Sequence, residues 1–91
     1  MTVRDSETLT IGAAASGLTT AKIETDIATV QIESDGEIRY WTSGKTPTPT
    51  SGFVMVPYDQ ILLTRVEALQ FKAIRSGGAD VLIHAQYYLA I

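Results

Sequence analysis

Residues 27–42, IATVQIESDGEIRYWT, carry the clearest structural signal in the chain. In the first half of this stretch apolar and polar side chains alternate strictly: Ala28, Val30 and Ile32 against Thr29, Gln31 and Glu33. A period of two residues is typical of a strand with one buried face. Asp35-Gly36 then supplies two residue types that tolerate positive φ in a tight turn. We therefore expect residues 30–34 and 37–42 to form a β-hairpin.

Short strands are also predicted outside this hairpin, because apolar runs and turn residues alternate at short intervals. Residues 8–11 form a first strand, and residues 1–7 are interpreted as a flexible N-terminal arm. Residues 52–57 form a short apolar strand that Pro57 closes. The last strand, residues 79–89, is partly apolar on both faces, which is typical of a central strand. Its two faces are Val81, Ile83, Ala85 and Tyr87, and Leu82, His84, Gln86 and Tyr88.

The segment 61–75, ILLTRVEALQFKAIR, fits two patterns. A helical period of 3.6 is matched by Ile61, Leu62, Arg65, Val66, Leu69 and Ala73. A strand period is matched by Leu69, Phe71 and Ala73, which alternate with Gln70 and Lys72. Because the segment runs into a Ser-Gly-Gly turn typical of hairpins, we favour strands over a helix.

The spacing of these segments indicates an all-β fold. About seven or eight short antiparallel strands, with turns every eight to twelve residues or so, are typical of a small β-sandwich of jelly-roll type or of a barrel. No internal repeat or interdomain linker divides the sequence, so residues 1–91 are interpreted as one β domain.

Composition excludes several classes of protein. A 91-residue chain without cysteine and with a single histidine lacks the disulfides and the Cys/His metal sites that stabilise many small domains. We therefore expect oligomerisation to supply the additional stability that such a small domain requires. A formal net charge of -3 with no basic stripe argues against nucleic acid. The sequence shows neither a signal peptide nor an apolar run near the roughly 18 residues of a membrane span, so we expect a soluble protein made in the cytoplasm.

One stretch resembles a phosphate-binding loop without matching it. Ser43-Gly44-Lys45-Thr46 looks like the end of the nucleotide motif, but that motif requires a glycine at the position of Arg39. Pro47 and Pro49 follow where the motif requires a helix whose N–H groups face the phosphate. We therefore predict no nucleotide site.

The ionisable residues indicate no catalytic or metal site. His84 lies in the middle of a predicted strand, and nothing in the chain order gives it a nucleophile and an orienting carboxylate. Glu33, Asp35 and Glu37 flank the expected turn, where acidic groups serve solubility, and their spacing does not match a calcium loop. We expect neither enzymatic activity nor a cofactor.

Four aromatic residues form the grouping with the most functional potential: Tyr40, Trp41, Tyr87 and Tyr88. Such side chains stack on sugars or fill the centre of a protein interface. Because Tyr87 and Tyr88 are adjacent, alternation places them on opposite faces of a strand, and at least one of them is expected to leave the core.

The sequence resembles a group of short virion structural proteins of tailed bacteriophages. The resemblance rests on Ile38-Arg39-Tyr40-Trp41, on the loop residues Ser43-Gly44, Pro47-Thr48, Thr50 and Gly52, and on the segments 71–79 and 9–19. These are turn and packing motifs that together span most of the chain. The sequence departs from the group's pattern at Ser43, where aspartate is usual, and at Pro49, a second proline.

The resemblance implies a non-enzymatic β-rich protein on the phage particle. We hypothesise a capsid decoration (cement) protein on the virion surface that forms a homo-oligomer, specifically a trimer, and bridges subunits of the major capsid protein. The loop from Gly44 to Gly52 is expected to reach a neighbouring subunit, because its prolines lower the entropy lost on docking. The expected partner interface consists of Trp41, Lys45, Thr46, Pro47, Thr48, Pro49, Tyr87 and Tyr88. The alternatives are a carbohydrate-binding module of a tail or spike, and a head-tail or tail accessory subunit.

Overall fold

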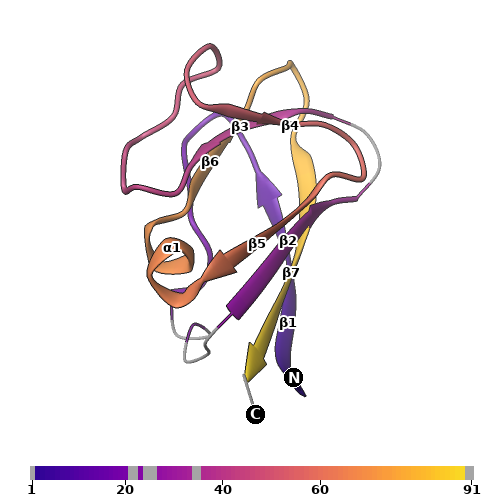
Figure 1. Cartoon of the computed structure of the whole chain (residues 1–91). Helices are drawn as coiled ribbons and strands as arrows, with labels where there is room; N and C mark the ends of the chain where they lie inside the picture. Colours follow the sequence, from indigo (N-terminus) through magenta and orange to yellow (C-terminus); the bar gives the residue numbers. More distant parts are fainter. Residues whose placement is uncertain (1, 21–22, 24–26, 34–35, 90–91) are drawn as a thin grey trace.

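The chain folds as two antiparallel sheets that face each other (Figure 1). The computed structural model describes residues 2–20, 23, 27–33 and 36–89. Sheet A has the strand order β1-β7-β2-β5, formed by Thr2–Ile11, Val81–Leu89, Ile27–Ile32 and Gln60–Thr64. Sheet B has the order β4-β3-β6, formed by Phe53–Met55, Ile38–Trp41 and Lys72–Arg75. The predicted all-β class is confirmed, with seven strands in the described residues arranged as a sandwich.

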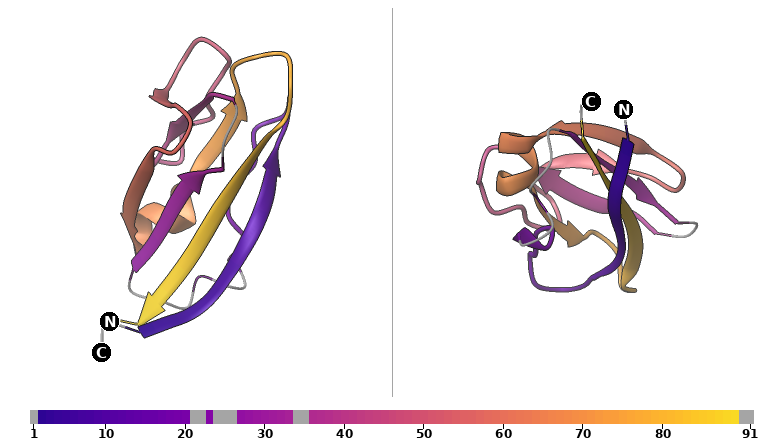
Figure 2. Two further views of the ribbon diagram at one scale, coloured as in Figure 1. Left: turned by 90° about the vertical axis from the view of Figure 1, so that its right-hand side faces the viewer. Right: turned by 90° about the horizontal axis from the view of Figure 1, so that it is seen from below.

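The core lies between the two sheets, where alternation places one face of each strand. In β7 the predicted inward set is confirmed: the side chains of Val81, Ile83, Ala85 and Tyr87 are all buried. Sheet B contributes Ile38, Met55 and Ala73 from the opposite side. As expected of a central strand, β7 has a neighbour on each side, β1 and β2 (Figure 2).

The N-terminal segment belongs to the sandwich. Residues 2–7, expected to form an arm, are part of the ten-residue strand β1, which runs along β7 from the pair Thr2 and Leu89 to the pair Ile11 and Val81. The arm was therefore the wrong interpretation. The cause is pairing with β7, which outweighs the charged and polar composition of residues 2–7.

The segment after β1 protects one edge of sheet B. The Ser16 N–H donates to the Ala73 carbonyl at 2.9 Å, and the Ala73 N–H donates back to Ser16 at 2.8 Å. The Arg75 N–H donates to the carbonyl of Gly12 at 3.1 Å. Residues 12–16 thus supply hydrogen-bond partners to the side of β6 that faces away from β3.

The predicted hairpin between residues 30–34 and 37–42 does not form. Strand β2 pairs with β5 and β7 in sheet A, whereas β3 pairs with β4 and β6 in sheet B. Ser34 and Asp35 lie outside the described residues. Gly36 has a φ of 112°, and a Cβ atom there would come within 2.5 Å of the Val81 side chain. The chain passes from sheet A to sheet B between β2 and β3. Gly36 allows the backbone to pass close to Val81 at this crossing.

The segment 61–75 divides into three elements rather than strands alone. After β5, the helix α1 spans Arg65–Gln70, and β6 follows at Lys72. Thr64 is the N-cap: the Glu67 N–H donates to its hydroxyl at 3.3 Å, and the Thr64 N–H donates to the Glu67 carboxylate at 2.9 Å. This capping box starts the helix, and Ala68 faces the core. The strand-only interpretation was wrong here, because it left out the Thr-x-x-Glu signal.

The core tyrosine is tied to β1 by a polar contact. The Tyr87 hydroxyl donates a short hydrogen bond to the carboxylate of Glu7, which also accepts from the Thr19 hydroxyl at 2.5 Å. Burial, followed by this hydrogen bond and the negative charges of Glu7 and Asp5, raises the pKa of Tyr87 far above its ordinary value of 10.0. The contact joins β7, β1 and residue 19, and it depends on a neutral phenol.

The capping box predicts the effect of Thr64→Ala. The variant should lower the free energy of unfolding by about 1 kcal/mol, because an N-cap side chain contributes that much. Urea denaturation followed by circular dichroism measures the change. Thr46→Ala, in an exposed loop, is the control and should change stability by less than about 0.5 kcal/mol. Equal losses in the two variants would contradict the role of the cap.

The phenol contact predicts a pH dependence for Tyr87→Phe. The variant should lose about 1.5–3 kcal/mol at neutral pH, the usual contribution of a hydrogen bond to a charged group. Because the folded state raises the tyrosine pKa, this contribution is complete below the unfolded value near pH 10 and falls as the pH rises above it. The difference in unfolding free energy between the two proteins should therefore shrink above pH 10.

Denaturation at a series of pH values measures that difference. Tyr88→Phe is the matched control, since its hydroxyl bonds only Gln86 among the described residues and its side chain lies outside the core. A gap between wild type and Tyr87→Phe that stays constant from pH 8 to about 11 would refute the proposed dependence on the neutral phenol.

Candidate functional surfaces

The eight expected interface residues do not form one surface. Six of them lie on β3 or in the β3–β4 loop of sheet B, and Tyr87 and Tyr88 lie on β7 in sheet A. Two of the eight, Pro47 and Tyr87, are fully buried and belong to the interior. The exposed members are Lys45, Thr46, Thr48 and Pro49, with Trp41 and Tyr88 half-buried. The aromatic grouping is divided in the same way, because Tyr40 and Trp41 share sheet B.

The β3–β4 loop extends beyond sheet B but has its own internal structure (Figure 1). Thr48 and Ser51 exchange two backbone hydrogen bonds of 3.0 and 3.1 Å. Gly44 and Gly52 have φ values of 84° and 132°, as expected of glycines that let the loop leave and rejoin the strands. The Lys45 ammonium lies 5.1 Å from the centre of the Trp41 ring, within range of a cation–π contact. The described residues 45–52 form this loop, and β4 is the next element after it, whereas the nucleotide motif runs directly into a helix.

An apolar groove lies where β4, β5 and α1 meet. Its volume is about 320 Å³, and its lining includes Tyr40, Phe53, Ile61, Leu62 and Leu63. Phe53 and Leu62 are both strongly exposed, at 60% and 62%. Burial raises the pKa of Tyr40, and the Asp59 carboxylate adds to this rise. The groove marks a side of the sandwich on which apolar side chains reach the surface.

The turn between β4 and β5 carries another exposed aromatic residue, Tyr58. The Asp59 N–H donates to the Val56 carbonyl at 3.0 Å, which closes a four-residue turn with Pro57 and Tyr58 in its centre. Tyr58 has a φ of 69°, a conformation that glycine or asparagine normally occupies. Its side chain is 68% exposed. A bulky exposed residue in a strained backbone position is a pointer to function.

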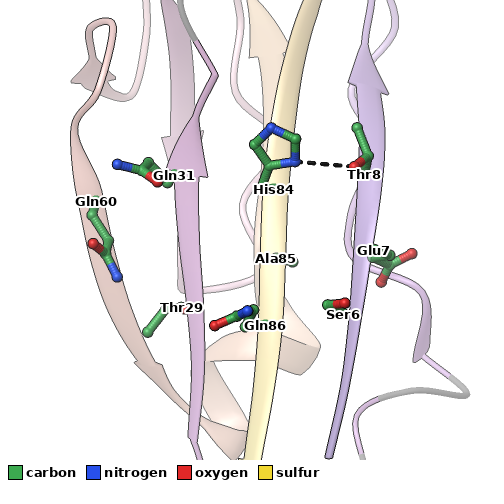
Figure 3. Close-up of a pocket in the computed structure, with 9 residues that line it drawn as sticks. All are labelled: Ser6, Glu7, Thr8, Thr29, Gln31, Gln60, His84, Ala85 and Gln86. Atoms are coloured by element: carbon green, nitrogen blue, oxygen red, sulfur yellow. Dashed lines mark hydrogen bonds between the residues drawn. The ribbon is translucent and has the colours of Figure 1, made fainter. Parts of the chain in front are cut away.

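A second, polar hollow covers the outer face of sheet A. Its volume is about 600 Å³, and all four strands contribute side chains to it (Figure 3). The lining includes Thr8, Thr29, Gln31, Gln60, His84 and Gln86. His84 is held at both ring nitrogens: Nδ1 lies 3.0 Å from the Thr8 hydroxyl, and Nε2 lies 3.2 Å from the Glu33 carboxylate. Sequence reasoning interpreted His84 as structural and did not place it in a site.

Both surfaces were missed at the sequence level for a definable reason. The apolar residues of 53–69 were assigned to strand and core positions, because nothing in a single sequence tells an outward-facing valine from an inward one. The polar face combines residues from four strands whose pairing order, β1-β7-β2-β5, depends on long-range contacts. The signal available was the alternation in β2 and β7, which identifies Gln31, His84 and Gln86 as outward-facing.

The described residues contain neither a cluster of metal-ligating side chains nor a membrane-spanning helix. In the described ranges no three His, Asp or Glu side chains gather closely enough to hold a metal ion. The helix found there is too short to cross a membrane.

Three comparisons with known proteins found no relative of the chain. No protein-family model matches the chain. Searches of curated proteins and of solved structures likewise found no significant match.

Proposed function

We propose that the protein is a structural subunit that associates with copies of itself and with a larger protein assembly. One observation carries this proposal. Of the nine large apolar side chains that are exposed in the described residues, seven fall within residues 53–69. We name this set the apolar strip; it consists of Phe53, Val54, Val56, Tyr58, Leu62, Val66 and Leu69. Phe53 and Leu62 of this set border one apolar groove, and exposed apolar side chains that gather at a groove typically mark interaction sites.

The strip has the parts of a protein interface. Phe53 and Tyr58 are rigid aromatic side chains of the type that dominates binding energy, and Leu62 borders the apolar groove that a partner's side chain can fill. Phe53 is also supported from behind, with its ring 5.9 Å from that of Tyr40 and 5.4 Å from that of Trp41. Rings held in place in this way lose little entropy on binding.

Two sheet edges border the strip. In the described residues β5 pairs only with β2, and β4 pairs only with β3. Each therefore presents unpaired backbone groups next to apolar side chains, a combination that favours association. Self-association also supplies the additional buried surface that a 91-residue domain without cysteine needs.

Within this class we favour a bacteriophage capsid decoration protein, present as a trimer on the virion surface and bound to the major capsid protein. The resemblance to phage virion proteins supports this assignment. The strip adds support, because a cement protein acts through buried contact area repeated by symmetry rather than through a catalytic site. The exposed loop residues Lys45, Thr46, Thr48 and Pro49 are then the second contact, directed at a neighbouring subunit.

The strip predicts the effect of Leu62→Gln on self-association. Loss of this side chain should raise the dissociation constant by about tenfold or more, the usual effect of removing an interface anchor. Sedimentation velocity over a concentration series measures the dissociation constant. Leu82→Gln is the matched control, because Leu82 is also exposed but lies on β7 outside the strip. A wild-type chain that stays monomeric at about 100 μM would refute self-association.

The capsid role requires its own measurement. Purified phage particles with and without the protein should differ in their resistance to heat and osmotic shock, and added wild-type protein should restore resistance where Leu62→Gln does not. Particles that lack the protein and keep full resistance would refute the cement role but would leave self-association standing.

The turn predicts opposite effects of Tyr58→Gly on stability and on association. Glycine relieves the positive φ, so the free energy of unfolding should rise by up to about 1 kcal/mol. Removal of the aromatic ring should weaken self-association by about tenfold. Denaturation and sedimentation measure the two quantities, with Tyr88→Gly as the comparison that lacks a positive φ. A variant that associates as tightly as wild type would show that Tyr58 lies outside the interface.

A further inference from the structure

The polar hollow on sheet A has a lining without cations or acidic side chains directed into it. The outward-facing residues of the described lining carry hydroxyl, amide or imidazole groups. Glu7 also borders the hollow, but its carboxylate accepts from Tyr87 and Thr19 and is therefore engaged elsewhere. Glu33 stands at the end of β2, where its carboxylate faces His84. The hollow thus offers hydrogen bonds without a net charge at its centre.

This chemistry narrows the class of ligand. An anionic ligand such as a phosphate or nucleic acid calls for Arg or Lys, which the described lining does not contain. An apolar ligand calls for apolar walls, and the lining side chains other than that of Ala85 are polar. A neutral molecule with many hydroxyl groups fits, because hydroxyls donate and accept hydrogen bonds, as the amides and hydroxyls of the lining also do.

The contacts of His84 with Glu33 and Thr8 determine which groups donate and which accept hydrogen bonds at one end of the hollow. A carboxylate only accepts hydrogen bonds, so in the neutral ring the proton lies on Nε2 and faces Glu33. Nδ1 is then an acceptor, and the Thr8 hydroxyl donates to it across 3.0 Å. The remaining lone pairs of the Thr8 oxygen point away from the imidazole, available as an acceptor for a ligand hydroxyl.

Two glutamines are oriented in the same way. The Tyr88 hydroxyl donates to Gln86 Oε1 at 2.6 Å, which leaves the Gln86 amide NH₂ as a donor. Gln31 Nε2 donates to the Tyr58 carbonyl at 3.4 Å, which leaves Gln31 Oε1 as an acceptor. The hollow therefore presents a donor at Gln86 and acceptors at Thr8 and Gln31 on three adjacent strands. Side chains fixed before binding lose less entropy when a ligand arrives.

We propose that the outer face of sheet A is a binding site for a neutral oligosaccharide. Neighbouring strands lie about 4.8 Å apart, so the four strands span about 14 Å, the extent of a di- or trisaccharide rather than of a single sugar. A volume of about 600 Å³ is within the usual range of ligand sites. Tyr88, half-buried on the same face as Gln86, provides an aromatic ring beside the polar groups.

The site is separate from Trp41, but it adjoins the apolar strip, because Leu62 pairs with Thr29 of the lining and the Tyr58 carbonyl accepts from Gln31. The aromatic platform expected from the sequence placed Trp41 with the tyrosines, but Trp41 belongs to sheet B. Binding through the sheet A face therefore predicts that Trp41 is dispensable for the sugar.

A glycan array bearing neutral, sialylated and sulfated oligosaccharides tests the proposal with the labelled full-length protein. We expect binding to one or more neutral oligosaccharides. Titration of the best neutral binder into ¹⁵N-labelled protein, up to about 10 mM, should then shift amide signals of β1, β2 and β7. The corresponding monosaccharide should bind more weakly, because it reaches fewer strands.

Matched substitutions locate the site. Gln86→Met keeps the length of the side chain and removes its polar atoms, and it should weaken binding about three- to tenfold. Gln70→Met, on the exposed surface of α1, should leave the affinity unchanged, as should Trp41→Ala. Absence of binding to any neutral glycan, a preference for sulfated glycans, equal effects of Gln86→Met and Gln70→Met, or loss of binding in Trp41→Ala would each overturn the proposal.

Discussion

The fold depends on β7, which pairs with a strand on each side and at the same time buries one of its two faces. Its inward side chains, Val81, Ile83, Ala85 and Tyr87, are all buried, while its backbone pairs with β1 on one side and β2 on the other. A shift of one residue in either pairing would turn the apolar set of a strand toward solvent. The register of sheet A is therefore fixed by burial. That register also aligns Thr8 with His84 and Thr29 with Gln86 across the outer face.

The two faces of sheet A thus follow from a single alternation. Each apolar residue that faces sheet B has a polar neighbour facing outward, so a core built from β-branched and small residues produces a polar surface behind it. The contact between Tyr87 and Glu7 places one polar interaction at the border of the core, where it joins β7 to β1. The functional surfaces differ in origin: the polar hollow comes from all four strands of sheet A, and the apolar strip comes from β4, β5, α1 and their connections.

The extent to which the sequence predicted this molecule can be traced to particular residues. Alternation identified β2, β7 and the all-β class, because each strand carries its own period. The partner of β2 was predicted wrongly, since Asp35-Gly36 is a local turn signal and pairing with β5 and β7 depends on contacts far apart in sequence. Thr64 and Glu67 did encode the start of α1, but the interpretation used the alternation over residues 69–73 and the Ser-Gly-Gly turn and left this signal out. Burial of Pro47 was unpredictable from a loop of Thr and Pro, because it depends on how the loop folds against the sandwich.

Residues 12–16 occupy the outer edge of β6, and this limits where another strand can add to sheet B. With Gly12 and Ser16 occupying that side, sheet B, as far as the described residues go, offers a foreign strand one open edge, at β4. Two copies that join edge to edge through β4 consume both open edges, and the joined sheet has no further place for a third strand to add. Such pairing would close sheet B to further strand addition, whereas the edges of sheet A at β1 and β5 would stay open.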